Sequence, residues 1–209
     1  MSDLTRFWLI RHALVADHAR TRIYGNTDVP ICEDTMDAQE DAYADLARRL
    51  PRPAHWLITP LSRTRRTAEA LFRAGYPAAP LEVEPDLIEQ SFGDWHGLVH
   101  ADVPARLTMP AHPFWAHGGD EQPPAGESVT HVRQRVGAVL ERLPDARPGQ
   151  DVVSVSHGGT IRAAVAHALD LTPHATLSLS VQNISLTVLE RVGGHWRVVC
   201  VNSGVSDFT

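Results

Sequence analysis

Cysteine is nearly absent from this chain, which carries only Cys32 and Cys200 among its 209 residues. Two cysteines so far apart in the chain do not make a disulfide framework, and they are not spaced like the ligands of a zinc site, so we expect both to be reduced and structural. No apolar run approaches the length that crosses a bilayer. The first residues also lack the basic start and apolar stretch of a signal peptide. We therefore expect a cytoplasmic protein that does not associate with a membrane.

Basic runs and flexible linkers are missing as well. The formal net charge is −6, and the arginines are dispersed, so the sequence argues against a nucleic-acid-binding surface. A small anionic ligand would have to be held by a local positive pocket in an acidic protein. With 43% hydrophobic residues and no Pro/Gly-rich or charged linker, residues 1–209 are expected to form one domain with a full core. The sequence leaves open whether the chain forms a homodimer.

Short apolar runs alternate with segments of helical periodicity along the chain. Strands are expected at 7–10, 56–59, 81–84 and 152–156, helices at about 36–50, 128–143 and 160–169 and around Ala68, Leu71 and Phe72, and a terminal hairpin at 184–192 and 196–201. Strands that alternate with helices favour a parallel sheet covered on both faces, and the hairpin would add an antiparallel edge. We therefore predict an α/β fold, a three-layer α/β/α sandwich with a mostly parallel sheet.

The segment from about 90 to 126 is weakly patterned and rich in Pro, Gly and His. A long insert of this kind in a compact domain is more often functional than idle, so we interpret it as a lid over a binding site. Its aromatic side chains Trp95, Phe114 and Trp115 could pack an aromatic or otherwise apolar part of a ligand.

Two histidines follow buried strands at corresponding places. Arg11-His12 comes directly after the apolar run 7–10, and His157-Gly158-Gly159 comes after the run 152–156. In open α/β sheets, ligands bind at the ends of such strands. Arg63 follows a third apolar run, 55–58, near the start of a helix. Paired histidines with arginines close by indicate phosphoryl chemistry.

These three elements, in this order, resemble the histidine phosphatase superfamily, which includes cofactor-dependent phosphoglycerate mutases, broad phosphomonoesterases and α-ribazole phosphatase. The resemblance extends from Leu9 to the C-terminal hairpin. It implies a phosphoglycerate mutase-like fold, with neither metal nor cofactor expected. It further implies that His12 is a nucleophile that becomes a phosphohistidine, and that Arg11, Arg63 and His157 bind the phosphate group.

Glu89 matches the remaining part of the family pattern. It stands at the start of Glu-Gln-Ser-Phe-Gly-Asp-Trp-His-Gly, residues 89–97, and the family has a glutamate before a Phe/Gly/Trp/Gly cluster that serves as general acid. The resemblance thus implies that Glu89 protonates the leaving alkoxide and then, as a base, activates water.

The chain departs from the family near the first histidine. Ala13 stands where the family usually has glycine, and the Thr and Asn usually found a few residues later are missing. Asn26 or Thr27 could supply a substitute phosphate contact or could only shape a turn. Residues 24–30 and 123–128 look most like the compact phosphatase branch, and the segment between Glu89 and His157 is short for a glycolytic mutase. We therefore expect a small phosphorylated metabolite to be hydrolysed, with α-ribazole 5′-phosphate as a candidate.

Other functions are weighed against this one. Mutase-type phosphoryl transfer and an inert phospho-ligand-binding module both stay open. A serine hydrolase would need the G-x-S-x-G elbow, which residues 154–158 do not supply. His96 and His100 have a metal-ligand spacing but lack the glutamate of a zincin motif, so they are interpreted as surface or lid residues. Arg65 and Arg66 are expected on a solvated helix face.

Overall fold

The computed structural model describes residues 4–204, and its centre is a six-stranded sheet in the order β3-β2-β4-β1-β5-β6. The strands are β1 (Thr5–Arg11), β2 (His55–Ile58), β3 (Leu81–Val83), β4 (Asp151–Ser156), β5 (Leu186–Val192) and β6 (His195–Ser203). Pairing is parallel from β3 through β2 and β4 to β1, and antiparallel from β1 to β5 and from β5 to β6. The expected mostly parallel sheet with an antiparallel edge is confirmed.

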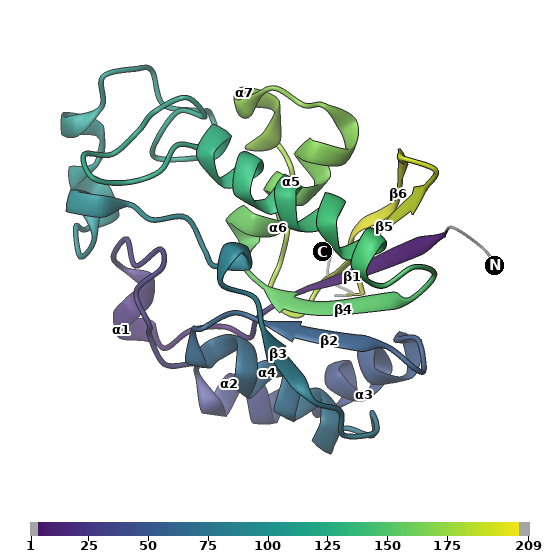
Figure 1. Ribbon diagram of the computed structural model, residues 1–209. Coiled ribbons are helices and arrows are strands. Elements are labelled where there is room, and N and C mark those ends of the chain that lie inside the picture. Colours follow the sequence, from purple (N-terminus) through teal and green to yellow (C-terminus); the bar gives the residue numbers. More distant parts are fainter. Residues whose placement is uncertain (1–3, 205–209) are drawn as a thin grey trace.

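Helices cover both faces of this sheet (Figure 1). They are α1 (Asp17–Arg20), α2 (Glu33–Ala38), α3 (Glu40–Arg49), α4 (Ser62–Arg73), α5 (Val129–Ala146), α6 (Gly158–Leu169) and α7 (Pro173–Thr176). One core cluster joins the sheet to α3 and α4 through residues such as Trp56 and Leu71. The other joins the opposite face to α5 and α6 through residues such as Leu9 and Val136. The three-layer α/β/α sandwich is therefore confirmed.

Side-chain alternation along β1 produces these two cores. Leu9 packs with the α5 and α6 cluster, whereas the next residue, Ile10, packs with the α3 and α4 cluster, as expected for a strand buried on both faces. No helix within residues 4–204 is both long and apolar enough to cross a membrane.

Element boundaries differ from the expectation in a few places. The helix expected at 36–50 is broken at Gln39, which separates α2 from α3 with φ −108° and ψ 22°. No proline or glycine marks this break in the sequence. α5 continues past residue 143 to Ala146 with Pro144 in its last turn, and α6 begins at Gly158, not Thr160.

The register of the sheet brings the ends of β1 and β4 together. Arg11 pairs with Ser156, and the backbone N–H of His12 donates to the carbonyl oxygen of Ser156 at 2.9 Å. Residues 12 and 157 therefore leave the same edge of the sheet from neighbouring strands. β2 pairs with β4 on the other side, so the start of α4 lies at the same edge.

The insert at 90–126 contains three short 3₁₀ helices: η2 (Gly93–Trp95), η3 (His100–Asp102) and η4 (Pro104–Arg106). Trp95 and Val103 of the insert form a small apolar cluster with Ile23, which lies after α1. Glu121 fastens it internally by accepting hydrogen bonds from the backbone N–H groups of Thr108 and Met109. The insert lies beside the α5 N-terminus and α1 (Figure 1).

Candidate active site

His12 lies directly after β1 and is held by bonds that define its tautomer. Its ring is buried, and Nδ1 lies 2.6 Å from the carbonyl oxygen of Ala13. Because a carbonyl oxygen only accepts, Nδ1 must carry the proton, which leaves Nε2 with its lone pair. The carbonyl oxygen of His12 accepts from the side-chain amide of Asn183 at 2.8 Å. The ring is thus fixed as the tautomer that a nucleophile at Nε2 requires.

The surroundings of His12 keep it neutral. Burial, followed by the nearby charges of Arg63 and Arg11, holds the pKa of His12 well below its ordinary value. A histidine so placed is unprotonated at neutral pH, and its lone pair is available to attack an electrophile.

His157 forms the other half of the histidine pair. It follows β4 as the N-cap residue of α6, is fully buried, and its ring meets that of His12 edge to face at a centroid distance of 5.1 Å. Nε2 shares a hydrogen bond of 2.9 Å with the hydroxyl of Thr59, whereas Nδ1 is buried without a partner. Burial first, then His12 and the two arginines, hold the pKa of His157 well below its ordinary value.

Arg63 stands in the first turn of α4 and is fully buried. Its two terminal nitrogens donate to the backbone carbonyls of Thr27 and Gly25, each at 2.7 Å, and its guanidinium lies over the ring of Tyr24. Nε is buried without a partner. The loop at 24–28 therefore serves to orient Arg63.

The side chain of Asp28 secures the same loop by accepting from the backbone N–H and hydroxyl of Ser62 at the start of α4. Thr27 acts here through its carbonyl group, and the cavity described below is lined by Tyr24 and Gly25, not by Asn26 or Thr27. The loop at 24–28 therefore contributes to the site through backbone carbonyl groups and not through the side chains of Asn26 or Thr27.

Arg11 completes a set of unpartnered nitrogens at the sheet edge. One terminal nitrogen donates to the carbonyl oxygen of Val181 at 2.6 Å, and Nε is buried without a partner. Arg11, Arg63 and His157 therefore each carry a buried nitrogen with no hydrogen-bond partner. Leaving buried donors unpaired is costly, and such groups usually mark a place where a ligand supplies the acceptors. Anionic oxygens would satisfy the Nε donors of Arg11 and Arg63, and His157 Nδ1 as well in the tautomer that carries its proton there.

Glu89 faces the same edge from the segment before the insert. One carboxylate oxygen accepts from the backbone N–H of Gln90 at 2.9 Å, and the other accepts from that of Gly159 in the first turn of α6 at 3.1 Å. A β-carbon at Gly159 would lie 2.3 Å from the Glu89 carboxylate. Only glycine permits this approach.

A cavity of about 180 Å³ opens beside these groups. Arg11, Glu89 and the first two residues of α6 line its floor, and apolar side chains line much of its wall. The apolar wall residues are Ile23, Phe92, Trp115, Val129, Val132 and Leu177. The cavity lining therefore combines charged groups with apolar side chains.

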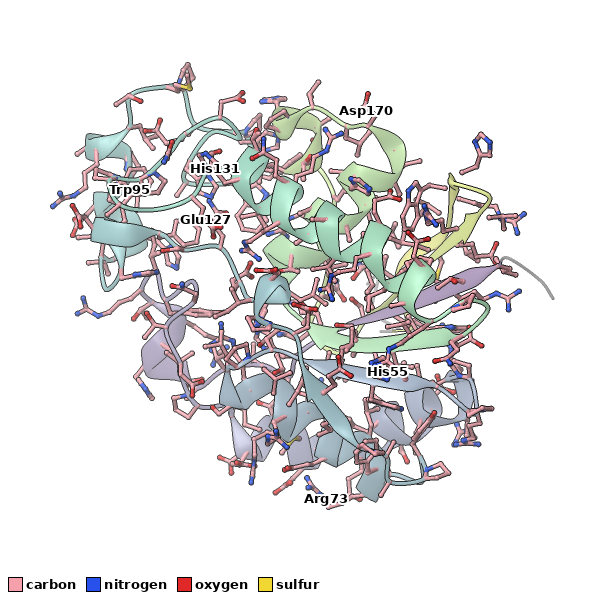
Figure 2. The ribbon with its side chains drawn as sticks, viewed as in Figure 1. His55, Arg73, Trp95, Glu127, His131 and Asp170 are labelled. Atoms are coloured by element: carbon pink, nitrogen blue, oxygen red, sulfur yellow. The ribbon has the colours of Figure 1, made fainter. Side chains whose placement is uncertain are left out.

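Of the three insert aromatics expected to pack a ligand, Trp115 alone lines this cavity. Trp95, labelled in Figure 2, belongs to the insert. It packs with Ile23 and Val103. Phe114 is 75% exposed. The expectation for Trp95 and Phe114 was wrong, because composition does not tell which face of an irregular segment points inward.

The residue that replaces the family glycine fits without strain. Ala13 is buried, is not among the residues with positive φ, and its N–H donates to the hydroxyl of Thr67 at 2.9 Å.

His96 accepts from the backbone N–H of Phe92, and His100 lines the cavity. Within residues 4–204, no three His, Cys, Asp or Glu side chains are grouped as metal ligands.

Sequence reasoning missed two residues of this site. Thr59 binds His157, and its place at the end of an apolar run was the available signal. Arg162 lines the cavity, and it stands four residues after Gly158, the spacing that places two helical side chains on one face. Neither residue type is distinctive enough to be selected without the fold.

Comparison with known proteins places this site in context. The model of the histidine phosphatase superfamily (branch 1) matches residues 7–204. A bifunctional protein of Mycobacterium tuberculosis is 30% identical over 186 residues, which are 89% of this chain and 50% of that protein. The chain thus spans about half the length of this curated relative.

Solved structures resemble nearly the whole chain. A mycobacterial glucosyl-3-phosphoglycerate phosphatase aligns with a TM-score of 0.77 and 26% identity, covering 95% of this chain and 99% of the other. The α-ribazole phosphatase of Shigella flexneri aligns with a TM-score of 0.74 and 20% identity, covering 95% and 96%. The second likeness, at this identity, is one of fold.

Proposed function

The chain belongs to the histidine phosphatase superfamily, branch 1, and we propose that it is a phosphomonoesterase that hydrolyses a small phosphorylated metabolite through a phosphohistidine at His12. The single observation that carries the proposal is the arrangement of buried, unpartnered nitrogens on Arg11, Arg63 and His157 beside a neutral His12. A phosphoryl group would supply acceptors to the two guanidinium donors, and to His157 in the tautomer that carries the proton on Nδ1, while its phosphorus faces His12.

In the first half-reaction, His12 Nε2 forms a bond to phosphorus while the bond from phosphorus to the ester oxygen breaks. Protonated Glu89 gives its proton to the leaving oxygen, which departs as an alcohol. In the second half-reaction, the Glu89 carboxylate takes a proton from water, the water oxygen bonds to phosphorus, and the bond to His12 breaks. Inorganic phosphate leaves, and both residues return to their starting states.

The residues that line the cavity bear on the identity of the substrate. α-Ribazole 5′-phosphate is a candidate because Phe92 and Trp115 line the cavity and would pack against an aromatic leaving group. Phosphoglycerate mutase activity is the enzymatic alternative, and it would require 2,3-bisphosphoglycerate to prime the enzyme. An inert binding module is the other alternative, and it would show no turnover.

The test is a kinetic screen. Purified protein is assayed with p-nitrophenyl phosphate and with a panel of phosphorylated metabolites that includes α-ribazole 5′-phosphate and 3-phosphoglycerate, with and without added 2,3-bisphosphoglycerate. Phosphate release without the bisphosphate, abolished in a folded His12→Ala variant, is the expected result. Isomerisation that depends on the bisphosphate would favour a mutase, and no turnover of any ester would contradict the proposal.

A further inference from the structure

Arg162 is a buried cation that the proposed reaction does not use. It lies on α6, lines the cavity, and is 8% exposed. Within residues 4–204, its guanidinium nitrogens have no hydrogen-bond or ion-pair partner, and its one ring contact is with Trp115. Buried charges are ordinarily paired, because removing them from water is costly. An unpaired guanidinium on a cavity wall therefore points to a ligand that brings the opposite charge.

Trp115 holds the guanidinium in place. The Cζ atom of Arg162 lies 4.2 Å from the centroid of the indole ring, and the indole nitrogen in turn donates to the carbonyl oxygen of Leu177 at 2.7 Å. A contact with the ring face does not use the N–H donors of the guanidinium, which stay available for an anion. The insert thus supplies a fixed platform for a cation that belongs to α6.

The guanidinium lies next to the phosphate end of the cavity. A β-carbon built on Gly158 would lie 3.3 Å from Nε of Arg11 and 3.5 Å from Nη1 of Arg162, so the two arginines flank this glycine. Burial lowers the pKa of Arg162 to about 10, with Glu89 opposing and Arg11 adding to the effect, so the side chain is charged at neutral pH. Both Glu89 oxygens already accept backbone N–H groups.

We propose that Arg162, stacked on Trp115, is the subsite for a second anionic group of the substrate, a carboxylate on the alcohol half of the ester. The assignment rests on the proposed phosphatase function, which gives Arg11, Arg63 and His157 to the phosphoryl group. A planar carboxylate matches the edge of a guanidinium with two parallel hydrogen bonds. On this assignment the alcohol half of the ester carries a carboxylate that reaches Arg162 at the cavity, which favours carboxylated phosphate esters over α-ribazole 5′-phosphate, which has no carboxylate.

A matched pair of esters isolates this contact. 3-Phosphoglycerate and glycerol 3-phosphate share a three-carbon skeleton and differ in having a carboxylate or a hydroxymethyl group. We expect Arg162→Gln to lower kcat/KM for 3-phosphoglycerate roughly 10- to 100-fold, the loss expected for charged hydrogen bonds, and to leave kcat/KM for glycerol 3-phosphate within about twofold. Arg162→Lys keeps the charge but loses the forked pair of donors. Its kcat/KM for 3-phosphoglycerate should lie between the values of the wild type and of Arg162→Gln.

Two further variants make the result interpretable. Trp115→Leu should reduce the ratio of kcat/KM for 3-phosphoglycerate to that for glycerol 3-phosphate, because the indole ring that positions the guanidinium is lost. Arg133→Gln removes an arginine of α5 that binds the carbonyl oxygen of Leu171 outside the cavity, and it should leave both substrates unchanged. Equal losses of both esters in Arg162→Gln would instead assign Arg162 to the phosphoryl group and overturn the proposal.

The nature of the second anion is tested in the same assay. Fructose 1,6-bisphosphate and fructose 6-phosphate form a second pair, in which the added anion is a phosphate and not a carboxylate. If Arg162→Gln lowers kcat/KM only for the bisphosphate, the carboxylate assignment is overturned. Calorimetric binding of 3-phosphoglycerate and glycerol 3-phosphate separates this proposal from the phosphatase proposal. If no ester is turned over, tighter binding of 3-phosphoglycerate that Arg162→Gln removes would still support the subsite, and equal binding of the two would contradict it.

Discussion

The Glu89 carboxylate accepts a hydrogen bond of 3.1 Å from the backbone N–H of Gly159, in the first turn of the helix that begins after His157. This bond ties the proposed general acid to the same helix terminus that approaches the phosphate site. It exists because residue 159 has no β-carbon, which would lie 2.3 Å from the carboxylate.

Gly159→Ala should therefore displace Glu89 and lower kcat/KM roughly 100-fold or more, the usual contribution of a general acid. The double variant with Glu89→Gln provides the control. If the added methyl group acts through Glu89, adding Gly159→Ala to the Glu89→Gln variant should lower kcat/KM little further. Additive losses would show that Gly159 acts by another route.

Arg63→Lys should lower kcat/KM roughly 10- to 100-fold although the charge is kept. A lysine has one ammonium group and cannot hold the carbonyls of Gly25 and Thr27 while also facing the phosphate. Arg66→Lys is the matched control on the same helix, because Arg66 is exposed and pairs with Glu33. Kinetics of Arg63→Lys that equal those of the control would remove Arg63 from the site.

Glu89→Gln should damage hydrolysis of alkyl phosphates far more than that of p-nitrophenyl phosphate, whose phenolate leaves with little help from a proton. Single-turnover rates for both ester types measure this difference. The phosphoenzyme should also live longer, because the same carboxylate activates water. An equal loss for the two leaving groups, with an unchanged phosphoenzyme lifetime, would assign Glu89 a structural role.

The stability of the fold should depend on pH through His12 and His157. Burial is the main cause that holds the pKa of both well below the ordinary value, so the unfolded chain takes up protons near pH 6.5 that the folded chain does not. The free energy of unfolding should therefore fall as the pH drops below about 6.5, by up to about 1.4 kcal/mol per pH unit for each histidine. Above that pH the two groups add no slope.

Urea unfolding across this pH range measures the effect. His157→Gln should remove one histidine's share of the slope. A wild-type stability that stays flat or rises on acidification would contradict the buried, neutral state of the pair.

Apolar runs made the central strands predictable. The runs around Leu9, Leu57 and Val153 are buried on both faces of the sheet, and such strands have a continuous apolar signature. Because residues 12, 63 and 157 follow these strands, their convergence could be predicted too. The break at Gln39 could not, since no glycine or proline marks it, and α1 and α7, of four residues each, are too short for a periodic pattern.

The cavity wall was harder to predict than its floor. The sheet sets the positions of residues that follow its strands. In the insert at 90–126, local hydrogen bonds set the side-chain directions, and the sequence has no periodic pattern there from which to predict them. Trp115 and Trp95 both belong to the insert, yet Trp115 lines the cavity and Trp95 packs with Ile23 and Val103. The single-domain organisation of 1–209, closure of the insert as a lid and formation of a homodimer stay predictions.

The central claim is that phosphate passes through His12. Enzyme mixed with substrate is denatured in alkali within the first turnover, digested, and analysed by mass spectrometry, since phosphohistidine survives base and is lost in acid. We expect one phosphoryl group on His12, absent from a sample acidified before digestion and absent from His12→Ala. A phosphoryl group on another residue, or rapid turnover with no base-stable phosphoenzyme in wild type and in Glu89→Gln, would contradict it.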